Sequence, residues 1–230
     1  MAIKRKQVRK DTDTLINLAE AKTKATGFFE ENQKIIIGVI AALVLVIGGW
    51  FVYTNLIKGP KEEKAMSQMW MAQVQFEQDS FQVALDNPGG GHPGFINIIS
   101  DYKGTKAGNL ASYYAGVAYL NLGNFEAAKS HLEDFTPAGL IGPVMKHGAL
   151  GDTYSELNQM DKAMEQYKKA AESSDNELLT PYYLKKLALL HELQGEKDKA
   201  LDIYRKIKSQ YPNSNEALSI DKYIARAEAQ

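Results

Sequence analysis

Two contrasting patterns of hydrophobic and polar positions divide the chain. The stretch from Ile35 to Ile57 is apolar for 23 residues and contains no charged side chain. As an α-helix it would be about 34 Å long, enough to cross a hydrocarbon core of about 30 Å. After Pro60, apolar residues recur at helical spacing among polar ones, which predicts amphipathic helices packed together. We therefore predict an all-α protein in which a single transmembrane helix precedes a helical domain.

A cleaved secretory signal is the alternative to an anchor. The apolar run begins only after residue 34 and exceeds the ~7–15 residues of a signal-peptide core. The end of the run and the residues after it, Asn55 to Pro60, contain no small-x-small cleavage site. Trp50 and Tyr53 lie near its end, where aromatic rings favour the membrane interface. These features favour an uncleaved anchor at 35–57.

Basic residues predict the orientation of the anchor. Residues 1–34 contain eight Lys or Arg and five acids, whereas residues 35–230 contain 19 basic and 23 acidic residues. Within ~20 residues of the span the bias disappears, but the cluster from Lys4 to Lys10 favours a cytoplasmic amino terminus. Residues 61–230 would then lie in the periplasm of a bacterium, beyond its inner membrane.

The basic tail, residues 1–34, contains a short amphipathic pattern at residues 12–31. Leu15, Ile16, Leu18 and Phe28 are among its apolar positions. The pattern predicts a helix on the bilayer surface, helped by its lysines. A docking helix for a cytoplasmic partner is the alternative.

A repeated spacing of small and large residues marks the helical domain. In three units a small residue is followed three positions later by Tyr or His, twelve later by Ala and sixteen later by a large residue. The small residues are Gly116, Gly151 and Ala188, and the large ones are Leu132, Tyr167 and Tyr204. The units start 35 and then 37 residues apart. This spacing predicts helical hairpins that cross closely at the small residues, with the large ones filling the space between neighbouring hairpins.

These units resemble tetratricopeptide repeats. The resemblance implies a degenerate unit at 61–103, repeats at about 109–142, 144–178 and 181–212, and a capping helix at 215–229. One hairpin cannot bury its apolar face alone, so we expect a solenoid of about eight or nine helices. The position that usually carries Trp instead holds Ser112, His147 and Leu184.

Residues 87–94 interrupt the helical pattern with three consecutive glycines between two prolines. This composition predicts a loop. It does not match a phosphate-binding loop, because no strand precedes it and no Lys-Ser/Thr follows. We expect His92 to be exposed there, and we assign the loop no role.

No residue pattern indicates catalysis or a cofactor. The chain has no cysteine, and its four histidines lack partners at metal-ligand spacing. Nucleophile, nucleotide and dinucleotide motifs are missing from the sequence. With a net charge of −1, nothing favours nucleic acid. We expect neither enzyme activity nor a bound metal or cofactor.

The tetratricopeptide resemblance implies a protein-binding groove on the first helix of each hairpin. The family's groove positions lie six and three residues before the small residue, and one and four after it. Here they are Leu110, Tyr113, Val117, Leu120, Met145, Gly148, Asp152, Ser155, Tyr182, Lys185, Leu189 and Glu192. This set lacks a basic cluster to hold a carboxylate, so exposed apolar segments are the expected ligand. Alternatively, the three leucines simply pack against neighbouring helices.

The whole layout resembles the YfgM-like family of bacterial inner-membrane proteins. The resemblance covers roughly residues 12–230 and includes the segment Gly94 to Gly116 that leads into the first clear repeat. It implies an ancillary chaperone or adaptor of the SecYEG translocon. Such a protein works with a membrane-anchored PpiD-like peptidyl-prolyl isomerase and receives unfolded exported clients. A structural adaptor of envelope assembly or cell division, binding one folded partner, is the alternative.

Overall fold

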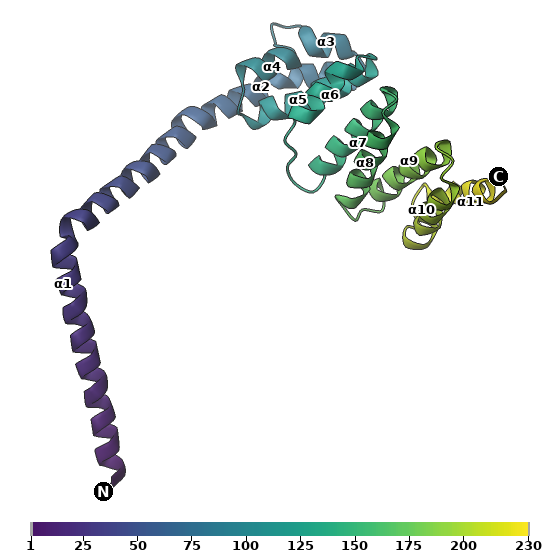
Figure 1. The fold of residues 1–230 in the computed structure, drawn as a ribbon. Helices are drawn as coiled ribbons and strands as arrows, with labels where there is room; N and C mark the ends of the chain where they lie inside the picture. Colours follow the sequence, from purple (N-terminus) through teal and green to yellow (C-terminus); the bar gives the residue numbers. More distant parts are fainter. Residues whose placement is uncertain (1, 230) are drawn as a thin grey trace. The chain divides into compact units, whose positions relative to one another are not determined.

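The computed structural model describes residues 2–229, with side chains placed for residues 26–28 and 30–229. The chain divides into two compact units, Met1–Gly59 and Pro60–Gln230. Each unit is helical throughout its described elements (Figure 1). The two units are considered separately below.

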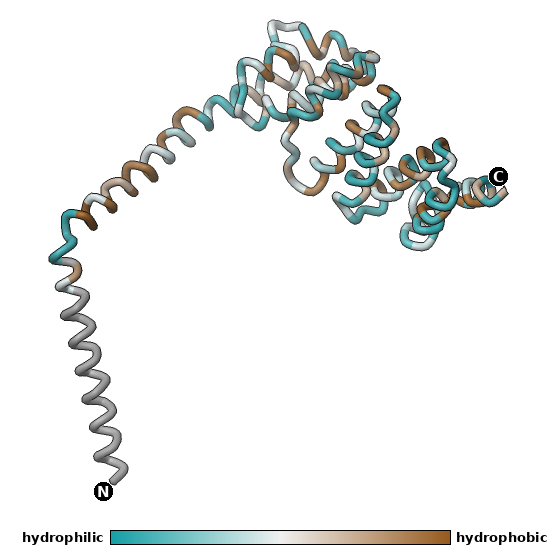
Figure 2. The backbone as a smooth tube through the Cα atoms, viewed as in Figure 1, coloured by the Kyte–Doolittle hydropathy of each residue, from teal (hydrophilic) through white to brown (hydrophobic). Residues whose placement is uncertain are grey.

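The first unit is one long helix that ends in a π-helical turn. α1 runs from Ala2 to Val52, and the π-helix covers Tyr53–Lys58. In this turn the side chains of Thr54 and Asn55 each donate a hydrogen bond of 2.9 Å to a backbone carbonyl one turn earlier. The helical stretch Glu30–Glu77 contains a window long and apolar enough to cross a membrane (Figure 2). None of that window is buried.

The short amphipathic pattern at residues 12–31 lies within α1. It is part of the long helix, and no break separates it from the apolar stretch. Its side chains up to residue 25 lie outside the described set. Its placement on a bilayer surface therefore stays a prediction.

The second unit opens with three helices of unequal length. These are α2 (Gly59–Glu77), α3 (Phe81–Asp86) and α4 (Phe95–Asp101). The chain turns between α2 and α3 at Asp79, whose φ of 56° is left-handed. Because of this break and the short α4, the described part of the second unit has ten α-helices, α2 to α11, rather than the expected eight or nine.

The segment between α3 and α4 is a loop, as predicted. Gly89, Gly90 and Gly91 have φ values of 93°, 63° and 76°, a conformation that glycine adopts without steric cost. The prediction that His92 is exposed was wrong. His92 is half-buried, because the loop brings its ring edge-on to Trp70 of α2 with the centroids 5.6 Å apart.

α2, α3 and α4 pack on α5 through one apolar core. Met69, Leu85 and Phe95 are fully buried in it. Glu62 of α2 also accepts hydrogen bonds from the first backbone N–H groups of α5, at 2.7 and 2.9 Å. A carboxylate at a helix amino terminus is favourable because it satisfies unpaired donors and faces the positive end of the helix dipole.

Three helical hairpins and a final helix complete the unit (Figure 1). The hairpins are α5 (Lys106–Asn121) with α6 (Phe125–Asp134), α7 (Gly142–Glu156) with α8 (Met160–Glu172), and α9 (Leu179–Leu193) with α10 (Lys197–Gln210). Each helix packs mainly on its neighbours in the chain. A 3-10 turn, Ala217–Ser219, leads into α11, Ile220–Ala229, which packs on α10.

The small residues of the repeat lie where the two helices of a hairpin cross. A Cβ atom on Gly116 would lie 2.5 Å from Leu132, and one on Gly151 would lie 2.4 Å from Tyr167. Leu132 and Tyr167 thus first fill the space within their own hairpins, where we had expected them between hairpins. They also join a common core with residues of the next hairpins, such as Leu187.

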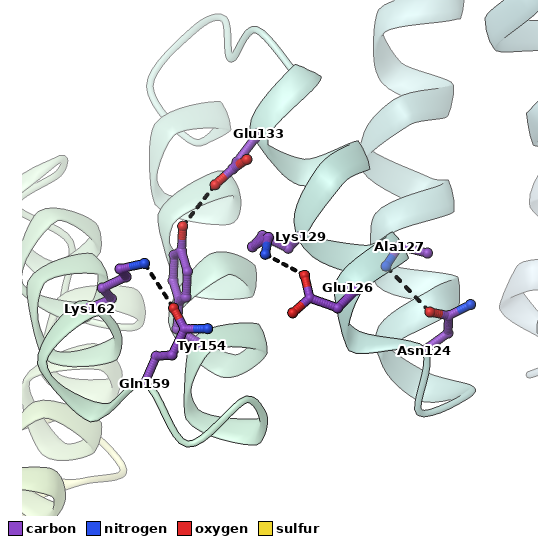
Figure 3. A network of polar contacts seen from close by, with 8 residues as sticks. All are labelled: Asn124, Glu126, Ala127, Lys129, Glu133, Tyr154, Gln159 and Lys162. Carbon is purple, nitrogen blue, oxygen red and sulfur yellow. Dashed lines mark hydrogen bonds and ion pairs between the residues drawn. The ribbon is translucent and has the colours of Figure 1, made fainter.

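Polar contacts also connect the first two hairpins (Figure 3). Tyr154 of α7 donates its hydroxyl to Glu133 of α6 at 2.8 Å. Burial and the Glu133 carboxylate raise the pKa of Tyr154 to about 12, so its hydroxyl stays a donor at neutral pH.

Asn124 accepts a 3.3 Å hydrogen bond from the N–H of Ala127 and so caps α6.

Candidate functional site

A cavity of about 640 Å³ lies between the first helices of consecutive hairpins. Its lining includes Leu120 of α5, Asp152 and Ser155 of α7, Tyr167 of α8 and Lys186 of α9. Leu120, Asp152 and Ser155 occupy groove positions inferred from the sequence. The structure therefore brings groove positions of two hairpins to one cavity, and α9 supplies a charged wall.

The charged centre of this cavity joins three helices. Oδ1 of Asp152 accepts a hydrogen bond from the Tyr167 hydroxyl at 2.6 Å and one from Lys186 Nζ at 2.5 Å. Burial lowers the pKa of Lys186, but its contact with Asp152 outweighs this effect and the net shift is upward. Lys186 is therefore a cation at neutral pH, held at the surface of the cavity.

Tyrosines surround this ion pair. Lys186 Nζ lies 5.1 Å from the ring centroid of Tyr182 and 5.4 Å from that of Tyr167. Tyr182 meets Tyr183 edge-on, with centroids 4.9 Å apart, and is 41% exposed. Burial raises the pKa of Tyr183 and also that of Tyr113, the latter to about 12. The site presents neutral aromatic rings and hydroxyl donors around one cation.

Gly148 provides the space for Tyr183. A Cβ atom at Gly148 would lie 2.1 Å from the Tyr183 hydroxyl oxygen. Gly148 is itself buried, so this inferred groove position contributes a hollow and no side chain. Tyr183 lies across α7 and carries the aromatic surface from one hairpin to the next.

The remaining inferred groove residues differ in their surroundings. Leu110 packs against the core between α2 and α5, while Tyr113 and Val117 pack against the core shared by the later hairpins. Met145 and Leu189 are half-buried. Leu110 thus packs against a core, whereas Leu120 lines the cavity.

Lys185 and Glu192 contact α11. Lys185 Nζ lies 5.0 Å from the ring centroid of Tyr223. Glu192 accepts hydrogen bonds from Arg226 and, at 2.6 Å, from the hydroxyl of Tyr204. Burial raises the pKa of Glu192, but these hydrogen bonds outweigh it and hold that pKa below its usual value. The groove surface of α9 thus continues onto α11.

Among the inferred groove positions Lys185 is the one basic residue, and α11 adds two more beside it. Lys222 and Arg226 of α11 join Lys185 around Tyr223, at 4.9 Å and 5.0 Å from the ring centroid. The repeat spacing did not reveal this cluster because α11 lies beyond the third unit. The contact between Lys185 and α11 depends on how the chain turns back after α10.

A larger cavity, of about 770 Å³, lies on the opposite face of α9. Leu184 and Leu187 of α9 form part of its lining, with charged residues of α8 and α10 such as Lys168 around them. Its residues come mainly from the second helices of hairpins. Ligand binding at this second cavity can therefore be compared with ligand binding at the groove.

Sequence reasoning missed Tyr183, Lys186 and the residues of α11. Tyr183 and Lys186 each lie one residue beyond an inferred groove position, so the repeat spacing does not place them in the groove. Gly148 carried a usable signal, because a glycine in a position that normally holds a side chain leaves room for a neighbouring ring. Tyr223 had no comparable signal in the repeat.

Stacked helical hairpins with aromatic and charged side chains on their first helices define a class of proteins that bind other proteins. Models of the tetratricopeptide repeat match this chain at residues 110–136, 147–177 and 186–214. The all-α fold with tetratricopeptide repeats and a long apolar amino-terminal helix is confirmed. Proteins with these repeats are typically adaptors without enzyme activity. No curated protein matches the chain.

Proposed function

We propose that this protein is a membrane-anchored adaptor that binds segments of other proteins along α5, α7 and α9. The observation that carries the proposal is the cavity between these helices, lined by the Asp152–Lys186 pair, with the exposed ring of Tyr182 beside Lys186. Aromatic rings provide contact area at little cost in conformational entropy, and the charged pair provides orientation. Such a surface suits extended segments of varied sequence.

The apolar stretch Ile35–Ile57 supplies the anchor in this proposal. Its side chains are exposed, including Leu45 at 77% and Trp50 at 70%, and a contiguous apolar surface of this size is stable only in lipid or against a partner. The cluster from Lys4 to Lys10 favours a cytoplasmic amino terminus. Residues 61–230 would then act in the periplasm, at the inner membrane.

The resemblance to the YfgM-like family supports a finer role. On this proposal the protein is an ancillary, translocon-associated chaperone or adaptor that stands beside a SecYEG-type channel. It cooperates with a PpiD-like isomerase and holds exported chains before they fold. The alternative, an envelope or division adaptor for one folded partner, would use the same surface.

Site-specific crosslinking in living cells tests the surface and the role together. The photoreactive residue p-benzoylphenylalanine is introduced in place of Tyr182, at the groove, or in place of Lys168, at the opposite cavity. Each full-length variant is irradiated, purified in mild detergent and examined by mass spectrometry. We expect crosslinks from position 182 to many newly exported proteins, with channel subunits and a PpiD-like isomerase co-purifying.

Three other outcomes would change the proposal. Crosslinks from position 168 alone would move binding to the opposite cavity. Crosslinks from position 182 to one folded envelope protein would support the structural adaptor. Equal crosslinking from both positions would contradict a specific groove.

A further inference from the structure

Three cationic side chains converge on the ring of Tyr223. Lys185 Nζ, Lys222 Nζ and the Arg226 guanidinium carbon lie 5.0, 4.9 and 5.0 Å from its centroid. Each distance is within the ~6 Å at which a cation is attracted to an aromatic face. Like charges brought together in this way repel one another, so the cluster favours an anion that enters it.

The cluster has little negative charge of its own. Glu192 is 13% exposed and pairs with Arg226. The acids of α11 pair elsewhere, Asp221 with Lys208 at 2.7 Å and Glu228 with Arg205 at 2.8 Å. Among the residues that the structure describes, Lys185 and Lys222 form no ion pair. Three cations against one carboxylate leave two positive charges uncompensated.

This cluster lies at one end of the proposed groove. Tyr182, Lys185 and Glu192 share a face of α9, because their spacing places them on the same side of a helix. Lys185 and Glu192 of that face contact Tyr223 and Arg226 of α11. A chain bound along Tyr182 can therefore reach the cations without leaving the surface.

We propose that the cluster of Lys185, Lys222 and Arg226 binds an acidic segment of the protein held in the groove. This inference rests on the proposed function and adds the charge of the preferred ligand. Carboxylates of Asp and Glu match ammonium and guanidinium groups, and Arg226 favours planar anions. A peptide is favoured over nucleic acid because the cations form a compact cluster, whereas residues 35–230 carry net negative charge.

Binding of two labelled peptides to the full-length protein tests the inference. The protein is placed in nanodiscs of phosphatidylcholine, which carries no net charge. Both peptides share an unstructured apolar and aromatic half, and they end in a glutamate-rich or a glutamine-rich half. We expect the glutamate peptide to bind about tenfold more tightly, since a few exposed ion pairs together contribute about that factor. Added salt should reduce the difference.

Two double variants locate the effect. Lys185→Gln with Lys222→Gln should reduce the preference to less than about twofold, and a circular dichroism spectrum and unfolding midpoint like those of the wild type show that the variant is folded. Lys103→Gln with Lys206→Gln changes the net charge equally at exposed positions elsewhere. This control should keep the full preference.

The outcomes separate the inference from the proposed function. If neither peptide binds, the groove itself is wrong and the inference falls with it. If both peptides bind equally, the groove stands and the acidic preference is refuted. If the control variant also loses the preference, the effect is one of net charge. If Lys185→Gln with Lys222→Gln instead reduces binding only to phosphatidylglycerol vesicles, the cluster recognises lipid.

Discussion

Single glycines set how closely the helices of this protein approach. Gly116 and Gly151 admit Leu132 and Tyr167 within their own hairpins, whereas Gly148 admits Tyr183 from the next one. The first two follow from the repeat spacing. The third departs from it, because it replaces a groove side chain with a ring from a neighbouring helix.

Gly148→Ala should destabilise the helical domain by about 1–3 kcal/mol. Alanine favours a helix over glycine by up to about 1 kcal/mol, but its Cβ would overlap the Tyr183 hydroxyl, and that ring must move. Thermal unfolding of the full-length protein in detergent, followed by circular dichroism, measures the change.

Gly142→Ala, in the same helix, is the matched control. Its Cβ would lie 3.4 Å from Pro137, close to ordinary contact. We expect its unfolding midpoint to stay within a degree or two of wild type, which corresponds to less than about 0.5 kcal/mol. Equal destabilisation by both substitutions would contradict the role given to Gly148.

Among the elements, α11 completes the last repeat. Its buried Ile220 packs in the core that includes Ala188 and Tyr204. Its outward residues Asp221, Lys222 and Glu228 are exposed, which suits a helix at the end of a repeat array. Because α11 also carries Tyr223 and Arg226, its docking assembles the cationic cluster.

Ile220→Ala should loosen α11 and cost about 2–5 kcal/mol of local stability, because it leaves a cavity under the helix. Hydrogen exchange of the α11 amides should accelerate by at least tenfold, while amides of α5 and α7 change little. The substitution Leu218→Ala, at a side chain that is 83% exposed, should leave exchange unchanged. Uniform acceleration throughout the domain would show instead that α11 does not open as a local unit.

For the whole molecule, the proposed function makes the apolar helix the element that determines where the repeat domain works. In that proposal residues 35–57 lie in lipid, and this placement does not depend on what the groove binds. Membrane insertion and protein binding should therefore respond to different substitutions.

Leu45→Arg with Val46→Arg should release the protein from membranes. Arginine near the centre of a span costs about 2.5–3.5 kcal/mol for each residue, enough for two to weaken insertion substantially. Fractionation after alkaline carbonate extraction measures the membrane-bound share. The same pair of charges at Val83 and Leu218, which are 43% and 83% exposed in the helical domain, should leave the protein in the membrane fraction.

Much of the fold could be predicted from local pattern. The hairpins follow from small and large residues at fixed separations, because a helix places such residues on one face whatever surrounds it. The position of His92 could not be predicted. It depends on how the loop at residues 87–94 folds back on α2, which no periodicity records.

The candidate site was predictable only in part. Leu120 and Asp152 are reached by counting from the small residue of each repeat. Lys186 and Tyr183 are not, because their positions depend on the crossing of α7 and α9 and on the space left at Gly148. Counting by repeat spacing assumes that every hairpin packs in the same way. The packing of Tyr183 against Gly148 departs from that regular arrangement.

The sequence alone is enough to specify a long apolar helix and a series of hairpins, because length and periodicity are properties of neighbouring residues. Tertiary structure alone brings Lys185 to Tyr223 and Lys186 to Asp152. These residues are distant in the chain, and they meet only because helix packing turns particular faces toward one another. The arrangement of charges on this surface therefore depends on helix packing, whereas the hairpins that pack are specified by the repeat spacing.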